Sequence, residues 1–185
     1  MVIGDLDPSL TLETLLNAAV DGIIVIDHQG TIEVFNKAAE NIFGYRESDV
    51  VGQNVSMLMP PPDSERHDSY LQNFLSTRQA KIIGVGRDVL GRRKNGENFP
   101  MNLAVGETRY GQQSKFVGLV RDTTRTKMVA DQLDLVNDEL RLIFTEAPTG
   151  IIVTAESGQI INANFWITDF LKYSARELKN LHLLD

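Results

Sequence analysis

The chain has 185 residues and no cysteine, and this absence excludes several kinds of chemistry. Without thiols the protein has no disulfides, no thiolate zinc site and no cysteine nucleophile. Photochemistry that needs a cysteinyl adduct or a thioester-linked chromophore is excluded for the same reason. Histidine is scarce as well, with three in the whole chain, so the position of each one carries information.

Long apolar runs and an excess of basic charge are also missing. No stretch approaches the roughly 20 apolar residues of a membrane-spanning helix, and the opening sequence MVIGDLDPSL lacks the basic and apolar regions of a signal peptide. We therefore expect a cytoplasmic protein with no membrane segment in this chain. The 18 basic and 25 acidic residues give a net charge of −7, which argues against general binding to nucleic acid or anionic membranes.

The sequence does contain an internal repeat. Residues 15–50 realign on residues 143–178 without a gap, and this alignment places Asn36 on Asn164. Duplication of one domain explains such a match better than chance does. The second copy stops well before the length of the first, and a piece that short rarely buries enough apolar surface to fold alone. We therefore expect the chain to be part of a longer protein.

Hydrophobic periodicity and turn residues predict an α+β fold. Two strands, a helical middle and three more strands favour a five-stranded antiparallel sheet with helices on one face. The Asn95-Gly96 pair predicts a hairpin between the third and fourth strands. The expected helices lie at about 9–19, 37–43 and 47–58, with a further one that carries His67, and the expected strands at about 22–27, 32–35, 82–93, 97–109 and 114–122.

A connecting helix is expected at 124–147. Its apolar residues follow the 4, 3, 4, 3 spacing of a short coiled-coil seam, which favours parallel self-association; the alternative is a helix packed on its own domain. The seam consists of Val129, Leu133, Val136, Leu140 and Ile143.

His67 is the first polar residue in apolar company. On a helix it shares a face with Leu71, Phe74 and Leu75, so it is expected to point inward. A buried imidazole needs a carbonyl, a carboxylate or a metal as its partner, and a simple core or rim position is the alternative to a ligand role. The neighbouring Asp68 and Ser69 do not form a hydrolase triad with it, because adjacent helical positions point about 100° apart.

Arg87 is the second polar residue that the sequence places among apolar residues. In a strand, Ile83, Val85, Arg87 and Val89 share one face, and the next strand turns Phe99, Met101, Leu103 and Val105 to one side. If these faces and the His67 helix enclose one space, the result is an apolar pocket with one imidazole and one guanidinium, which is typical of a small-molecule site. The alternative is that Arg87 extends to solvent or pairs with a carboxylate. The cations of Arg92-Arg93-Lys94 flank the hairpin turn and are expected to be solvated.

Two motifs resemble the PAS sensory family. The segment DGIIVIDHQGTIEVFNKAAENIFGY resembles the PAS N-terminal signature, and VRDTT resembles the Asp-x-Thr junction that links many PAS cores to a signalling helix. The resemblance implies the PAS fold and a division into four parts. These are an N-terminal helix or cap (1–20), a first PAS domain that acts as the sensor (21–123), the connecting helix (124–147) and the start of a second, incomplete PAS repeat (148–185).

Residues 66–107 resemble, without a gap, the haem-binding PAS domain of the rhizobial FixL oxygen-sensing histidine kinases. The resemblance implies a haem b cofactor with His67 as the iron ligand and Arg87 as the hydrogen-bond donor to bound oxygen. Where that family has an arginine and a histidine near the propionates, this chain has Asn73 and Lys81. The other candidate cofactor-binding residues are Ile82, Leu103, Val105, Met101, Tyr70 and Lys81.

The function implied is a sensor of O2, another diatomic gas or redox state. The signal would pass through the connecting helix to an effector on the same longer chain, a histidine kinase or a cyclic-dinucleotide enzyme. A homodimer through the N-terminal and connecting helices is expected. Catalysis by this chain itself is not, because no nucleophile and base come together in the sequence. Two alternatives stay open: a cofactor-free PAS module for dimerisation and signal relay, and a PAS domain with a noncovalent flavin or small ligand.

Overall fold

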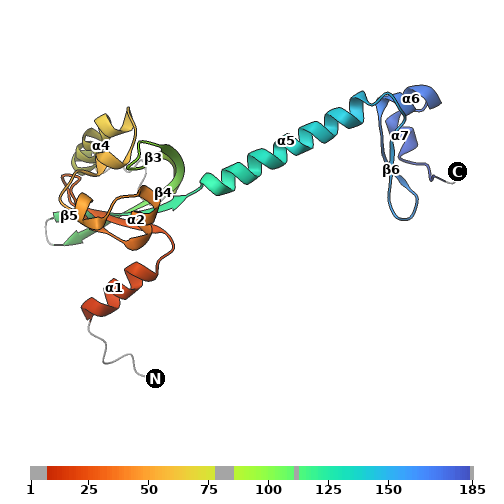
Figure 1. Ribbon diagram of the computed structural model, residues 1–185. Coiled ribbons are helices and arrows are strands. Elements are labelled where there is room, and N and C mark those ends of the chain that lie inside the picture. The colour runs from red at the N-terminus through yellow and green to blue at the C-terminus, as the bar shows by residue number, and fades with distance from the viewer. Residues whose placement is uncertain (1–7, 78–85, 111–112, 184–185) are drawn as a thin grey trace, which may run out of the picture. The chain divides into compact units, whose positions relative to one another are not determined.

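The computed structural model describes residues 8–77, 86–110 and 113–183. They form two compact units that divide between Arg125 and Thr126. The first unit contains a five-stranded sheet in the order β2-β1-β5-β4-β3, and every neighbouring pair is antiparallel (Figure 1). The strands are β1 (Gly22–Ile26), β2 (Ile32–Phe35), β3 (Arg87–Arg92), β4 (Asn98–Tyr110) and β5 (Gln113–Asp122).

Helical segments between β2 and β3 pack on one face of this sheet, as the sequence predicted. Together with the strands' inner faces they enclose a single apolar core, in which the ring of Phe43 lies 6.0 Å from that of Phe35 and 5.5 Å from that of Phe99. The predicted inward row on β4 belongs to this core. The helices of the unit are α1 (Pro8–Ala18), α2 (Lys37–Phe43), α3 (Glu47–Val50), the 3-10 helix η1 (Val55–Leu58) and α4 (Asp63–Thr77).

The structure divides one of the predicted helices into two separate helices. The segment 47–58 was expected to be continuous, but α3 ends at Val50 and η1 begins at Val55. Gly52 between them has φ +83°, a left-handed conformation that interrupts a helix and that glycine adopts without steric cost. Asn54 then starts η1, because its side-chain oxygen accepts a hydrogen bond from Ser56 N at 2.8 Å.

The hairpin predicted at Asn95-Gly96 is present. Arg93 N donates to Glu97 O at 2.9 Å, and Gly96 has φ +88°, as a three-residue hairpin loop requires at its last position. Strand β3 begins at Arg87, and residues 82–85 of the expected strand lie outside the described residues.

The second unit repeats the start of the first. It contains a long helix followed by a two-stranded antiparallel hairpin and two short helices. The turn that joins its strands closes like that of the first copy, with Ala155 N donating to Gln159 O at 2.8 Å where Asp27 N donates to Thr31 O at 3.0 Å. The elements are α5 (Thr124–Glu146), β6 (Ile152–Thr154), β7 (Ile160–Ala163), α6 (Phe165–Leu171) and α7 (Ala175–Leu178).

A buried asparagine fixes the helix after the second strand in both copies. Asn36 and Asn164 each cap that helix and also bind the backbone at the start of the copy's first strand, since one side-chain oxygen accepts both N–H groups. The same two bonds occur at equivalent positions in each copy, which supports the duplication seen in the sequence. The bonds are Ile23 N to Asn36 (2.8 Å), Ala39 N to Asn36 (3.0 Å), Ile151 N to Asn164 (2.9 Å) and Ile167 N to Asn164 (3.2 Å).

Candidate functional site

His67 lies on the inner face of α4, as its spacing predicted. Leu71 is buried, Phe74 and Leu75 are half-buried against the core, and the His67 side chain is 22% exposed. The Phe74 ring meets Phe116 of β5 edge-on, with centroids 5.8 Å apart. The helix therefore turns its imidazole and its apolar residues toward the sheet.

The surroundings of His67 favour the neutral form of its imidazole. Burial lowers its pKa below the ordinary value, and the neighbouring Asp68 opposes this shift only in part. Its Nδ1 atom is buried and has no hydrogen-bond partner among the described residues; the Oδ1 atom of Asp68 lies 3.6 Å away. Adjacent helical side chains were expected to diverge. In this pair the two side chains nevertheless approach each other.

Arg87 occupies a more open position than predicted. It is the first residue of the edge strand β3, directly opposite Leu103 of β4, and it is exposed. Its guanidinium forms no ion pair or hydrogen bond with any residue that the structure describes. The expectation that aliphatic side chains enclose Arg87 is therefore wrong within the described structure. Arg87 begins an edge strand, and its side chain is open to solvent.

The apolar candidates on β4 face inward. Met101 is buried, and Leu103 and Val105 are half-buried against the core. Tyr70 and Asn73 of α4 lie outside the His67 face and do not point into the core. Tyr70 is 44% exposed, and Asn73 is exposed as well. Lys81 and Ile82 lie outside the described residues.

The structure brings some of these residues together and leaves others apart. Arg87, Leu103 and Met101 are neighbours on β3 and β4. No interaction joins the His67 ring to the Arg87 guanidinium within the described ranges. However, η1 packs against both α4 and β3, so the helix of His67 and the strand of Arg87 share a neighbour. Met57 and Met59, in and beside η1, pack on the same core, and the sequence reading missed them because η1 was assigned to a longer helix.

Arg93 is not the solvated turn residue that the sequence suggested. Its guanidinium lies 3.8 Å from the ring centre of Phe99 and donates to Asp122 at 2.6 Å and to the carbonyl of Ile42. Asp122, the acid of the VRDTT junction, also accepts from Thr124 N at 2.8 Å and so caps α5. Burial acts to raise the pKa of Asp122, but hydrogen bonds from Thr124 and Arg93 lower it below its ordinary value. The hairpin turn is thereby tied to the first turn of the linker helix.

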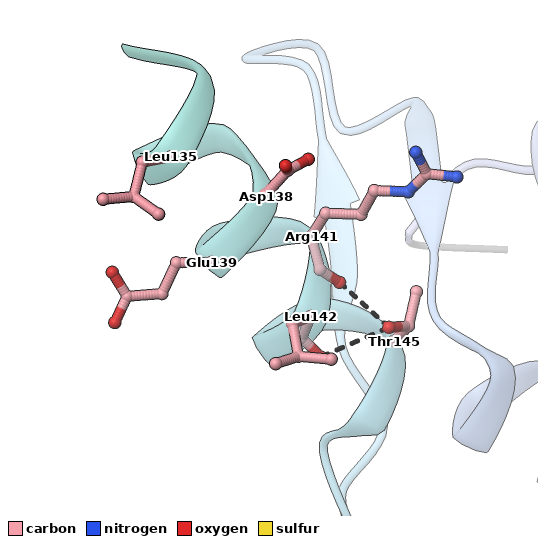
Figure 2. Close-up of a pocket in the computed structure, with 6 residues that line it drawn as sticks. All are labelled: Leu135, Asp138, Glu139, Arg141, Leu142 and Thr145. Carbon is pink, nitrogen blue, oxygen red and sulfur yellow. Dashed lines mark hydrogen bonds between the residues drawn. The ribbon is translucent and has the colours of Figure 1, made fainter. Parts of the chain in front are cut away.

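Helix α5 itself carries a shallow groove. Leu135 and Leu142 form its apolar floor, and Thr145 donates to the carbonyls of Arg141 and Leu142 at 3.0 and 3.2 Å (Figure 2). The groove contains none of the predicted cofactor-binding residues. Within the described ranges no helix is long and apolar enough to cross a membrane, and no three potential metal-ligating side chains gather.

Comparison with known proteins supports the fold. A family model described as the PAS fold matches residues 10–123, and one described as a PAS domain matches residues 148–185. Sensor protein FixL of Bradyrhizobium diazoefficiens is 38% identical over 167 residues, 90% of this chain and 33% of that protein. The cell-division control histidine kinase PdhS of Brucella ovis is 29% identical over 122 residues, 66% of this chain and 12% of that protein. The chain thus spans a third or less of these relatives.

Two solved structures show the same fold. The PAS domain of an HTR-like protein from Haloarcula marismortui is 25% identical, with a TM-score of 0.50 over 62% of this chain and 90% of its own. The PAS domain of a Colwellia psychrerythraea protein is 24% identical, with a TM-score of 0.54 over 64% of this chain and 99% of its own. The match to the PAS model covers more than half of the chain, and the five-stranded antiparallel sheet agrees with it. The chain therefore belongs to the PAS family.

Proposed function

We propose that the first PAS unit is a cytoplasmic sensor that binds haem b through His67 and responds to O2, another diatomic gas or redox state. One observation carries the proposal: the His67 imidazole lies on the inner face of α4 beside apolar residues of the core, and burial lowers its pKa. A neutral imidazole is the form that ligates haem iron. The 38% identity to sensor protein FixL supports the same reading.

The roles of the residues follow from their positions. Haem held through His67 would supply an iron that can bind a small gas. His67 provides the ligating nitrogen, while Met101, Leu103 and Val105 form an apolar wall that excludes water. Arg87, without another partner in the described part of the chain, is free to donate to a ligand that gains negative charge. Lys81 and Ile82 are included in the proposed site because of the sequence resemblance alone.

The rival proposal is a PAS module that relays signals without a cofactor. It is favoured by the dense packing beside α4, where Leu71 is buried and Phe74 rests on Phe116. Expression with a haem supply separates the two. We expect a red protein with a Soret band and one haem per chain. A colourless protein that takes up no added haemin would refute the haem proposal, and a yellow protein would point to flavin.

An Arg87→Ala variant is expected to keep haem and to bind O2 about tenfold or more weakly, because one charge-assisted hydrogen bond contributes about 1.5–3 kcal/mol. Equilibrium O2 titration measures the change, and the rate of iron oxidation in air is expected to rise. Arg92→Ala is the matched control, since Arg92 is also exposed on β3 but on its opposite face. Equal O2 affinity in the wild type and the Arg87 variant would remove this role.

Helix α5 is proposed to carry the signal and to join two copies of the chain, with α1 as a further contact. It has no buried residue, and its five seam residues are 45–61% exposed. Parallel pairing of two such seams would cover them. The effector, a histidine kinase or a cyclic-dinucleotide enzyme, would lie elsewhere on a longer chain, so this chain has a sensory and not a catalytic role.

Glutamate at both Val136 and Leu140 is expected to convert a dimer into monomers, because it places four charges in one seam. Sedimentation equilibrium over a range of concentrations gives the mass. Leu135→Glu is the control, since this equally apolar residue lies in the groove of Figure 2 and outside the seam. If the double variant dimerises as strongly as the wild type, the interface lies elsewhere, for example at α1.

A further inference from the structure

A series of polar contacts runs from the β1–β2 turn to the ring of His67. The side chain of Asn54 accepts from Ser56 N at 2.8 Å and donates to Gln29 O at 3.4 Å, so its orientation is fixed. The same amide donates to Oδ1 of Asp68 at 3.1 Å. That oxygen is also the one that lies 3.6 Å from Nδ1 of His67.

This geometry bears on which nitrogen of His67 carries the proton. A neutral imidazole has one N–H, and the hydrogen bond made by one nitrogen decides whether the other is free to bind a metal. Histidines that ligate metals usually donate their second N–H to a carboxylate or carbonyl. In His67 the buried nitrogen is Nδ1, and Oδ1 of Asp68 lies 3.6 Å from it, just beyond the usual hydrogen-bond distance.

We propose that Asp68 is a positioning residue for His67. Its carboxylate, held by Asn54, accepts the Nδ1–H hydrogen bond, fixes the ring and leaves Nε2 unprotonated and available as a ligand. The carboxylate also links α4 to the β1–β2 turn, so movement of the ring is transmitted to the sheet through Asn54. The consequence for bound haem rests on the proposed function, whereas the tautomer is a property of the protein alone.

The tautomer is measured on the haem-free full chain by long-range ¹H–¹⁵N correlation spectra at alkaline pH, with His67→Ala used to identify the ring's signals. We expect the Nδ1–H form in the wild type and a shift to the Nε2–H form in Asp68→Ala. Glu65→Ala is the control, because it removes one exposed carboxylate from the same helix without touching the ring. An Nε2–H ring in the wild type, or an unchanged ring in Asp68→Ala, overturns the proposal.

A second measurement uses haem-loaded protein. Loss of the Asp68 acceptor makes the imidazole a weaker electron donor, so we expect the iron–histidine stretching frequency to fall and the midpoint potential to rise in Asp68→Ala. No change in either quantity contradicts the role of Asp68 while leaving haem binding intact. Failure of the wild type to bind haem instead refutes the proposed function, and the tautomer experiment still decides the role of Asp68.

Discussion

His67→Ala is expected to abolish stable haem binding. Loss of groups that merely support a metal ligand weakens binding by about 10–100-fold, so loss of the ligand itself is expected to weaken it by at least about 100-fold. Haemin titration followed at the Soret band measures the difference. The haem-free fold should survive, because the substitution removes a buried nitrogen that has no hydrogen-bond partner within the described structure.

The other histidines provide the control for this experiment. His28→Ala alters the β1–β2 turn and is expected to bind haem like the wild type. A His67→Gly variant adds a gain-of-function test, since free imidazole is expected to restore the spectrum by occupying the vacated space. Full haem affinity in His67→Ala would show that another residue ligates the iron or that haem binds without an axial histidine.

Asn36→Ala is expected to lower the free energy of unfolding of the first unit by about 2–4 kcal/mol. The variant removes a helix cap, worth about 1 kcal/mol, and leaves buried backbone groups without partners at about 1–3 kcal/mol. Asn36 is 5% exposed, and its amide also donates to the carbonyls of Leu16 and Asp21 at 2.9 and 3.2 Å, so α1 is held by the same side chain. Urea unfolding followed by far-UV circular dichroism measures the loss.

The repeat supplies a matched experiment for this prediction. The sole tryptophan, Trp166, belongs to the second copy, so its fluorescence reports on that unit. Asn36→Ala should leave the fluorescence transition in place, and Asn164→Ala should shift it to lower urea concentration. Asn41→Ala, at an exposed position of α2, should change neither by more than about 0.5 kcal/mol. Coincident shifts in both signals would mean that the units unfold together.

Much of the fold was predictable because its signals are local. The alternation of apolar residues marked the strands, and the inward face of α4 followed from the spacing of His67, Leu71 and Phe74. The break between α3 and η1 was missed, since a glycine within an apolar pattern does not reveal whether its φ is positive. The φ of Gly52 is positive, and α3 ends before this residue.

For the candidate residues, the sequence predicted the inward face of α4 better than it predicted their surroundings. The structure confirms the inward position of His67, but the sequence could not show that Arg87 begins an exposed edge strand or that Asp68 lies 3.6 Å from the imidazole. Both facts depend on neighbours distant in sequence, such as Asn54, which holds Asp68. Arg93 was misread for the same reason, because its partners Ile42 and Asp122 lie far from it along the chain.

The contact between Arg93 and Asp122 has a consequence for what the linker helix responds to. A carboxyl whose folded pKa lies below its ordinary value of 3.8 contributes stability above that value and loses it only as the pH falls through the lower, folded pKa. Asp122 is therefore expected to stay ionised at neutral pH. The cap of α5 is thus expected to respond little to pH near neutrality, and its link to the hairpin is the contact between Asp122 and the Arg93 guanidinium.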